Sequence, residues 1–240
     1  MLRAQTALEI RMMLRNGEQL LLTVVIPVLV LVVFASIDLI DAGPRSARLA
    51  ALVPGVLALA IMSTAFTGLA ISTGFERRYG ALKRLGASPL SRGALLTAKV
   101  LAVLVVETVQ VLLLGTVALA MGWQPAGSPV SAVALLLVGT AAFAALGLLM
   151  AGTLRAEATL AGANLVYLLL LVAGGIAVPL DRFPEGARPL LAGLPSGALA
   201  EGLRDVLRDG AGARWGAMLV LLGWALAAGA LARATFRWES

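Results

Sequence analysis

Long apolar runs without a charged side chain are the feature that most constrains the fold of this chain. Residues 20–37 and 49–74 contain no Asp, Glu, Lys or Arg. A helix of about 20 mostly apolar residues crosses the hydrocarbon core of a bilayer, which is roughly 30 Å thick. Backbone polar groups in that core must be hydrogen-bonded within the protein, and a helix does this internally. The runs therefore predict transmembrane helices.

The composition agrees with a membrane protein. Hydrophobic residues make up 60% of the 240 residues and charged residues 13%, whereas soluble domains are about 45–50% apolar and about 25% charged. The chain has no Cys and no His, which excludes a disulfide scaffold, a thiolate zinc site and His-based catalysis. The net charge of +6 is distributed among apolar runs, so it indicates membrane topology rather than nucleic-acid binding.

The hydrophobic pattern predicts an all-α integral membrane protein with six transmembrane helices in one domain, residues 1–240. The first run is 18 residues long, longer than the roughly 7–15 residues of a signal-peptide core, so we expect it to be retained as a span. The predicted spans are residues 20–37, 49–74, 94–121, 130–154, 159–180 and 215–232.

The basic residues predict the orientation of these spans. They are concentrated in the N-terminal segment, the loop 75–93 and the C-terminal tail, whereas those of the connection 181–214 are matched by as many acids. Short loops rich in Lys and Arg remain on the cytoplasmic side of a membrane. We therefore expect both termini and the loop 75–93 in the cytoplasm, and the connection 181–214 outside it.

The N-terminal segment, residues 1–19, predicts an amphipathic helix that lies flat at the cytoplasmic interface. Ile10 and Met13 share an apolar arc, whereas Arg11 and Arg15 lie on a different face, where they would meet anionic head groups. A solvated N-terminal tail is the alternative.

The connection 181–214 contains three prolines and cannot form one helix. Between Ser196 and Gly210 the apolar residues recur at helical spacing, which predicts an amphipathic helix ended by the glycine. We expect its charged residues on a solvated face at the outer rim of the bundle. Two opposite-charge pairs lie three residues apart, Glu201 with Arg204 and Asp205 with Arg208.

Polar side chains inside the predicted spans are costly in lipid and mark functional or interhelical contacts. Lys99 lies near a span end, from which its ammonium group can reach the cytoplasmic head groups. One hypothesis places Glu107, Gln110 and Asn164 on the translocation path or the subunit interface, where a carboxylate would attract a cationic amphiphile. The alternative is an interhelical hydrogen bond, for instance between Glu107 and Asn164, that holds the bundle together.

Two stretches of sequence carry a family resemblance. The first is Glu76-Arg-Arg-Tyr-Gly-Ala-Leu-Lys-Arg-Leu-Gly-Ala-Ser-Pro-Leu-Ser-Arg92, and the second is Gly174-Gly-Ile-Ala-Val-Pro-Leu-Asp-Arg-Phe-Pro184, followed by Leu194-Pro195 and Glu201-Gly-Leu-Arg204. With the six predicted spans, they resemble the type-2 permease subunit of ATP-binding-cassette (ABC) exporters over essentially the whole chain. The permeases of actinobacterial multidrug or antibiotic-resistance exporters are the most similar in character. Family members often have acids at the positions of Arg78 and Lys83, so the ion pairing with a partner departs from the family pattern here.

The resemblance implies a half-transporter in the bacterial plasma membrane, paired with a second permease subunit, identical or related, and with two separate ATPase subunits. Residues 76–92 would form the coupling helix held in a groove of the ATPase; alternatively, their charges only enforce topology. No Gly-x-x-x-x-Gly-Lys-Ser/Thr pattern occurs, so ATP and Mg²⁺ are expected on the partner, and this chain is expected to hold no cofactor and to be no enzyme. The implied coupling residues are Glu76, Arg77, Arg78, Tyr79, Gly80, Leu82, Lys83, Arg84, Leu85, Pro89 and Arg92.

The predicted function is ATP-driven export of hydrophobic or amphipathic substrates such as drugs, antibiotics or lipids. Export of a polysaccharide, a lipid-linked glycan or haem is the alternative, although 6 Phe, 4 Trp and 2 Tyr offer few platforms for sugar rings. An ion-coupled secondary transporter would need several intramembrane acids and repeated broken helices. A membrane-embedded enzyme would need a convergent set of catalytic groups. The predicted spans offer neither.

Overall fold

The computed structural model describes residues 2–17, 21–36, 44–82, 91–176, 178–212 and 215–236. Within these residues the fold is a bundle of helices without β-strands. In chain order the elements are α1 (Leu2–Arg15), the π-helical turn η1 (Leu21–Val25), α3 (Ile26–Ser36), α4 (Arg45–Ile61), the π-helical turn η2 (Met62–Gly68), α5 (Leu69–Arg78), α7 (Arg92–Ala120), α8 (Pro129–Thr153), α9 (Ala156–Ala173), the 3₁₀ turn η3 (Leu180–Arg182), α10 (Arg188–Ala192), α11 (Pro195–Leu207) and α12 (Trp215–Thr235).

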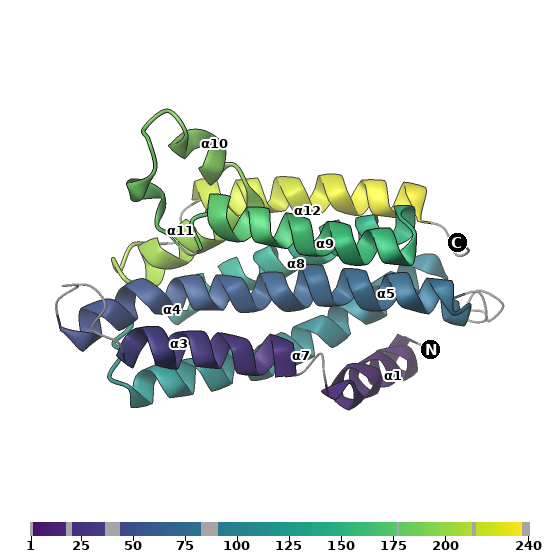
Figure 1. The fold of residues 1–240 in the computed structure, drawn as a ribbon, viewed down its shortest axis with the longest axis horizontal. Helices are drawn as coiled ribbons and strands as arrows, with labels where there is room; N and C mark the ends of the chain where they lie inside the picture. The colour runs from purple at the N-terminus through teal and green to yellow at the C-terminus, as the bar shows by residue number, and fades with distance from the viewer. Residues whose placement is uncertain are drawn as a thin grey trace.

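The long helices run side by side along the longest axis of the molecule (Figure 1). Helix α1 lies at the same end as the last turns of α5 and α12, and α10 and α11 lie at the opposite end. We call these the α1 end and the α11 end of the bundle. Within the described residues, five helices are long and apolar enough to cross a membrane: Arg45–Arg78, Gly93–Ala120, Pro129–Thr153, Ala156–Ala173 and Trp215–Thr235.

The first predicted span corresponds to a shorter helix. Elements η1 and α3 cover residues 21–36, and their apolar stretch Thr23–Ser36 is shorter than the five candidate spans. Residues 18–20 and 37–43, on either side of it, lie outside the described part of the chain. The all-helical architecture is therefore confirmed, whereas the prediction of six spans is not.

The second predicted span is part of one long helix with a π-helical centre. Elements α4, η2 and α5 follow one another without a break from Arg45 to Arg78. Pro54 lies inside α4 and lacks the N–H group that would bond to the preceding turn. The wider turn of η2 contains Ser63 and Thr67, and such π-helical turns within α-helices frequently occur at functional sites.

Helix α8 is the centre of the bundle and packs against α5, η2, α11 and α12. Small residues allow its neighbours to approach closely. A Cβ atom on Gly147 would lie 2.8 Å from the carbonyl oxygen of Phe66, and one on Gly139 would lie 2.9 Å from a methyl group of Leu199. Such close packing drives helix association in lipid, because the hydrophobic effect supplies no force between helices there.

Helix α9 ends earlier than the sequence predicts. The predicted span is 159–180, whereas the helix runs from Ala156 to Ala173. Gly174 follows as the helix cap, and Gly175 has a φ of +71°, a left-handed conformation that Gly adopts at no steric cost. The prediction of the C-terminal boundary is wrong because the two glycines turn the chain while its hydropathy is still high.

Helix α1 forms where the sequence predicts a helix, but a polar face holds it to the bundle. Gln5 and Glu9 are buried, whereas Leu2, Leu8 and Leu14 are exposed. The helix packs against α7, and its exposed apolar side chains are available to lipid. The predicted arrangement, with an apolar arc toward the membrane and charges elsewhere, is therefore incomplete, because part of the polar face is directed into the protein.

The helix expected to expose its charges at the outer rim is instead buried. Helix α11 packs against α4, α8 and α12, and Arg204 is 2% exposed. The predicted pair of Glu201 with Arg204 forms at 2.6 Å, while Arg208 pairs with its neighbour Asp209. The prediction of a solvated charged face is wrong for Arg204, which finds its partners inside the protein, whereas Arg208 and Asp209 are exposed as predicted.

Candidate functional site

The predicted coupling segment begins with the end of α5 and the turn that follows it. Gly80 has a φ of +70°, which allows the chain to turn sharply after α5, and Leu82 is fully buried. On the far side of the segment, Arg92 is the first residue of α7. The predicted coupling residues that lie outside the described part of the chain are Lys83, Arg84, Leu85 and Pro89.

Two arginines at the end of α5 contact the connection between α8 and α9. Arg77 is buried and donates a hydrogen bond to the carbonyl oxygen of Leu154. Arg78 forms an ion pair with Glu157 in the first turn of α9, and both of these side chains are exposed. Tyr79 is 69% exposed. The end of α5 is thus fastened on its inner side, while Arg78 and Tyr79 remain accessible from outside the bundle.

Lys99 is the centre of a buried ionic cluster at the α1 end. Its Nζ donates to Glu9 Oε2 at 2.9 Å and to Glu76 Oε2 at 2.6 Å. The second carboxylate oxygen of Glu9 accepts a hydrogen bond from Gln5 Nε2 at 2.8 Å. We call these four residues the Lys99 node. The node connects α1, the end of α5 and the first turns of α7.

The prediction that Lys99 reaches the head groups is wrong, because its side chain is only 1% exposed. Burial of a charge is tolerated only where partners compensate for the lost hydration, and two carboxylates do so here. These partners lie 90 and 23 positions away in the sequence. The cluster therefore depends on how three helices pack, and it holds Glu76, the first residue of the predicted coupling segment.

Gln110 ties α7 to two other elements. Its Oε1 accepts a hydrogen bond from the Thr64 hydroxyl at 3.0 Å, and its Nε2 donates to the carbonyl oxygen of Thr23 at 2.5 Å. Thr64 belongs to η2 and Thr23 to η1. Both polar atoms of the buried amide are therefore satisfied by neighbours in the bundle.

Glu107, Gln110 and Asn164 do not meet in one place. The Glu107 carboxyl group is buried against the Thr140 hydroxyl of α8, at 2.5 Å from Oε2. Its other oxygen has no hydrogen-bond partner among the described residues. Asn164 is exposed and donates to the carbonyl oxygen of Leu160 in its own helix. The suggested bond between Glu107 and Asn164 is therefore contradicted, and Thr140 takes the place of Asn164.

A cleft of about 580 Å³ opens between η1 and α3, the η2 region of the long helix, and α9. Its lining residues include no charged side chain among those that the structure describes. Hydroxyl and amide groups alternate there with aliphatic and aromatic surface. The polar lining residues include Thr23, Ser63, Thr67, Asn164 and Tyr167, and the apolar ones include Ile26, Leu59, Ile71, Phe75 and Leu160.

A second cavity of about 310 Å³ lies next to this cleft and is lined by residues of the Lys99 node. Both share Asn16, Ser72, Phe75 and Tyr79 in their walls, and the second also includes Lys99 and both of its carboxylate partners. The Lys99 node thus lines a cavity that shares four wall residues with the uncharged cleft.

Sequence reasoning missed Glu9, Thr140 and Tyr167. For Glu9 the sequence does contain a signal. A lysine buried in an apolar span, here Lys99, needs an acidic partner, and Glu9 lies on the short N-terminal helix. For Thr140 and Tyr167 we find no comparable signal. Their roles follow from which faces of α8 and α9 the packing directs toward α7 and η2.

One comparison with known proteins identifies the family of the chain. The family model described as "ABC-2 type transporter" matches residues 2–207, which include the cleft, the Lys99 node and α11. No curated protein matches the chain. A membrane domain of this family is the permease part of an ABC transporter, has no ATPase domain of its own and works with an ATPase subunit. The chain belongs to the ABC-2 type transporter family and is the permease subunit of an ABC transporter.

Proposed function

We propose that this permease exports hydrophobic or amphipathic molecules, such as drugs, antibiotics or lipids, from a bacterial plasma membrane. It would act with two ATPase subunits, which hold ATP and Mg²⁺, and with a second permease subunit, identical or related. Both termini and the α1 end would face the cytoplasm. The family match over residues 2–207 supports the transport class, and the basic residues near the α1 end support this orientation.

The mixed lining of the 580 Å³ cleft is the observation that carries the substrate class. Its volume falls within the range of about 300–1,000 Å³ that is usual for small-molecule sites. Phe75 and Ile71 offer apolar surface, while Asn164 and Ser63 offer hydrogen-bonding groups in the same walls. A ligand with both kinds of surface satisfies such a lining without leaving buried polar groups unpaired.

The three intramembrane residues receive different roles in this proposal. Asn164 contacts the cargo, because it lines the cleft. Gln110 supports the cleft wall from behind, since its amide holds the backbone of the lining residue Thr23. Glu107 holds α7 against α8 through Thr140. This assignment replaces attraction of a cation by Glu107 with recognition by uncharged polar groups.

The coupling residues divide into an anchoring set and an exposed set. Glu76 and Arg77 are held inside the bundle by Lys99 and by the Leu154 carbonyl group. Arg78 and Tyr79 are exposed and would contact the ATPase. Movement of the coupling segment would then reach α7 and α1 through the Lys99 node, because the node joins all three helices.

A lipid-linked glycan is the second candidate cargo. Phe75, Tyr79 and Tyr167 all line the cleft. Their ring faces can pack against sugar rings, and the two tyrosine hydroxyl groups can form hydrogen bonds with sugar hydroxyl groups. This observation concerns the cargo alone and leaves the ATP-driven mechanism unchanged.

The test uses the permease purified together with its ATPase and reconstituted in lipid vesicles. ATP hydrolysis and uptake into inside-out vesicles would be measured with a fluorescent cationic amphiphile, a neutral fluorescent lipid and a lipid-linked glycan. We expect the first two to stimulate hydrolysis. Stimulation by the glycan alone would favour the second candidate, and uptake driven by an ion gradient without the ATPase would contradict the proposal.

Two variants in α9 distinguish an effect on the cleft from a general effect on this helix. Tyr167→Ala removes an aromatic wall of the cleft, and we expect the half-stimulating cargo concentration to rise about tenfold. Leu165→Ala is the matched control, because Leu165 is 59% exposed and does not line the cleft. Equal responses of the two variants would contradict the assignment of the cleft as the cargo site.

A further inference from the structure

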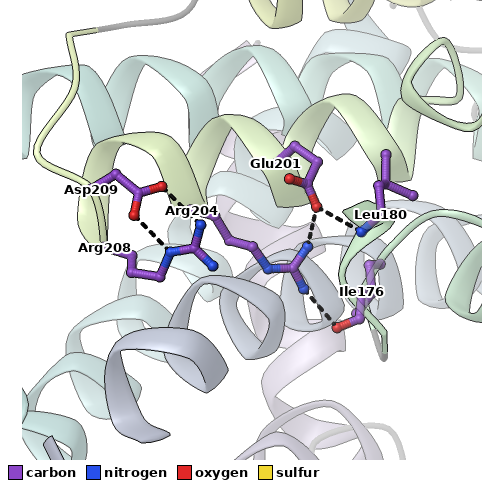
Figure 2. A network of polar contacts seen from close by, with 6 residues as sticks. All are labelled: Ile176, Leu180, Glu201, Arg204, Arg208 and Asp209. Carbon is purple, nitrogen blue, oxygen red and sulfur yellow. Dashed lines mark hydrogen bonds and ion pairs between the residues drawn. The ribbon is translucent and has the colours of Figure 1, made fainter. Parts of the chain in front are cut away.

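Arg204 in α11 and Arg208, the residue that caps the end of this helix, have opposite environments (Figure 2). Arg204 is buried, with 2% of its surface exposed. Arg208 is exposed and forms two hydrogen bonds with Asp209, at 2.8 and 2.9 Å. Among the described residues, the hydrogen bonds of the Arg208 guanidinium group go to Asp209, whereas Arg204 donates one to the chain that follows α9. The exposed pair of Arg208 with Asp209 therefore serves as a matched reference for the buried pair of Arg204 with Glu201.

Arg204 and Glu201 hold the segment that leaves α9. Arg204 Nη2 donates to the carbonyl oxygen of Ile176 at 3.2 Å, and Nη1 donates to Glu201 Oε1 at 2.6 Å. The same carboxylate oxygen accepts the backbone N–H of Leu180 at 3.3 Å. Figure 2 shows both side chains directed from α11 toward this segment. We call the two side chains with their two backbone partners the α11 clasp.

Glycines at two positions allow the backbone to approach closely enough for the clasp to form. A Cβ atom on Gly55 in α4 would lie 2.7 Å from the Ile176 carbonyl oxygen and 3.4 Å from Arg204 Nη2. A Cβ atom on Gly174 would lie 1.8 Å from the hydroxyl oxygen of Ser196 in the first turn of α11. The segment after α9 thus packs closely between α4 and α11, and a side chain at position 55 or 174 would collide with a neighbouring element.

The clasp acts on a helix that forms a wall of the cleft. Asn164 and Tyr167 of α9 line the cleft, and α9 ends at Ala173, immediately before the held segment. A buried ion pair is weak evidence for stability, because well-packed apolar residues often replace it without loss. The ion pair of Glu201 with Arg204 instead fixes the position of the end of α9 relative to α11.

We propose that Glu201 and Arg204 clasp the end of α9 to α11, so that both helices move as one unit during transport. Arg204 is then a positioning residue: it touches no cargo and, with Glu201, sets the place of the α9 wall through the backbone groups of Ile176 and Leu180. Loss of the clasp lets α9 move independently, and cargo binding and ATP hydrolysis become poorly linked. This consequence for transport rests on the proposed function. The claim that the clasp holds the segment after α9 in place does not.

Two changes of different chemistry break the clasp. The double variant Glu201→Gln with Arg204→Met removes both charges together, so no unpaired buried ion remains. Gly55→Ala leaves both charges in place and forces the Ile176 carbonyl group away from Arg204. The control for the first is Arg208→Met with Asp209→Asn on the exposed pair. The control for the second is Gly115→Ala, whose new Cβ atom meets nothing within 4 Å.

Hydrogen–deuterium exchange on the complex with the ATPase tests the structural part. We expect residues 170–182 to exchange about tenfold faster in both clasp variants, the change that follows the loss of one hydrogen bond to a charged group. Peptides of α8 and α12 and both controls should keep the wild-type rates. Unchanged exchange at 170–182 would overturn the proposal. Faster exchange in all helices would also overturn it, because it would show a general loss of stability.

Transport measured in vesicles tests the mechanistic part. We expect cargo moved per ATP to fall about tenfold in both clasp variants, while basal hydrolysis stays at the wild-type rate. Unchanged transport per ATP together with faster exchange at 170–182 would overturn the positioning role. Absence of transport by the wild-type complex would refute the proposed function instead, and the exchange result would still decide whether the clasp exists.

Discussion

Lys99→Met is predicted to release α1 from the bundle. Lys99 Nζ is bound to one carboxylate oxygen of Glu9 and one of Glu76. Methionine fills a similar volume but carries no charge and no donor. The substitution therefore leaves two neighbouring carboxylates without their shared cation, and α1 loses the partner of its buried Glu9.

The magnitude follows from the burial of the three side chains. Removal of one partner of a buried ion pair costs about 3–5 kcal/mol, because a charge remains without compensation. The Glu9 side chain is 5% exposed, but that of Glu76 is 21% exposed, so water reaches one of the two carboxylates. We therefore expect the lower end of the range, about 3 kcal/mol. Adding Glu9→Gln should recover most of this loss, because a single, partly hydrated carboxylate then remains.

Thiol labelling measures the release of α1 directly, because the natural chain has no cysteine. A cysteine at Met13, which packs against the core, reports undocking, and one at Leu8, which is 45% exposed, serves as the control. A change of about 3 kcal/mol corresponds to a labelling rate roughly 100-fold higher at position 13. The reasoning is refuted if Lys99→Met leaves that rate unchanged or raises the rates at both positions equally.

Three further predictions concern single residues. Gly174→Ala places a Cβ atom 1.8 Å from Ser196 Oγ, so we expect a loss of about 1–3 kcal/mol in thermal unfolding of the purified permease. Glu107→Gln should leave the transport of cationic and neutral amphiphiles unchanged, because Glu107 faces α8 rather than the cleft. The hydrogen bond from Arg208 holds the pKa of Asp209 below its usual 3.8, so the exposed pair stabilises the fold above that pH and ceases to do so as the pH falls through the lowered pKa. Asp209→Asn should therefore lower stability by less than about 1 kcal/mol at pH 7, and by nothing once Asp209 is protonated in the folded protein, as compared by thermal unfolding at both pH values.

Each of these has an outcome that would contradict it. Gly115→Ala, with no atom within 4 Å of its new Cβ, should unfold like the wild type, and an equal loss in both glycine variants would remove the steric explanation. A selective loss of cation transport in Glu107→Gln would return that carboxyl group to the translocation path. A larger effect of Asp209→Asn in acid than at pH 7 would reverse the sign derived above.

Most helices could be predicted from local pattern alone. The predicted spans 94–121 and 130–154 agree with α7 and α8 to within two residues at each end, because apolar runs of that length must be helical in lipid. The end of α9 could not be found from hydropathy, since the chain stays apolar beyond Gly174 while the backbone already turns. The first span is shorter within the described residues than its apolar run suggests.

The polar contacts were much harder to predict than the helices. The spacing of three residues predicts the pair of Glu201 with Arg204. It does not predict that Arg204 is buried or that it donates a hydrogen bond to the carbonyl oxygen of Ile176. A spacing within one helix is a local property, whereas burial depends on which other helices cover that face. For the same reason Lys99 was expected at the membrane surface and lies inside the protein.

The sequence by itself determined that this chain is a helical membrane protein. That result follows from quantities that each segment carries alone, which are its apolar length and its charge distribution. Only the tertiary structure decided that Glu9 meets Lys99, that Glu107 turns away from Asn164, and that α11 clasps the end of α9. These contacts join residues far apart in the chain. Many helix arrangements bury the same apolar faces, and side-chain packing selects one of them.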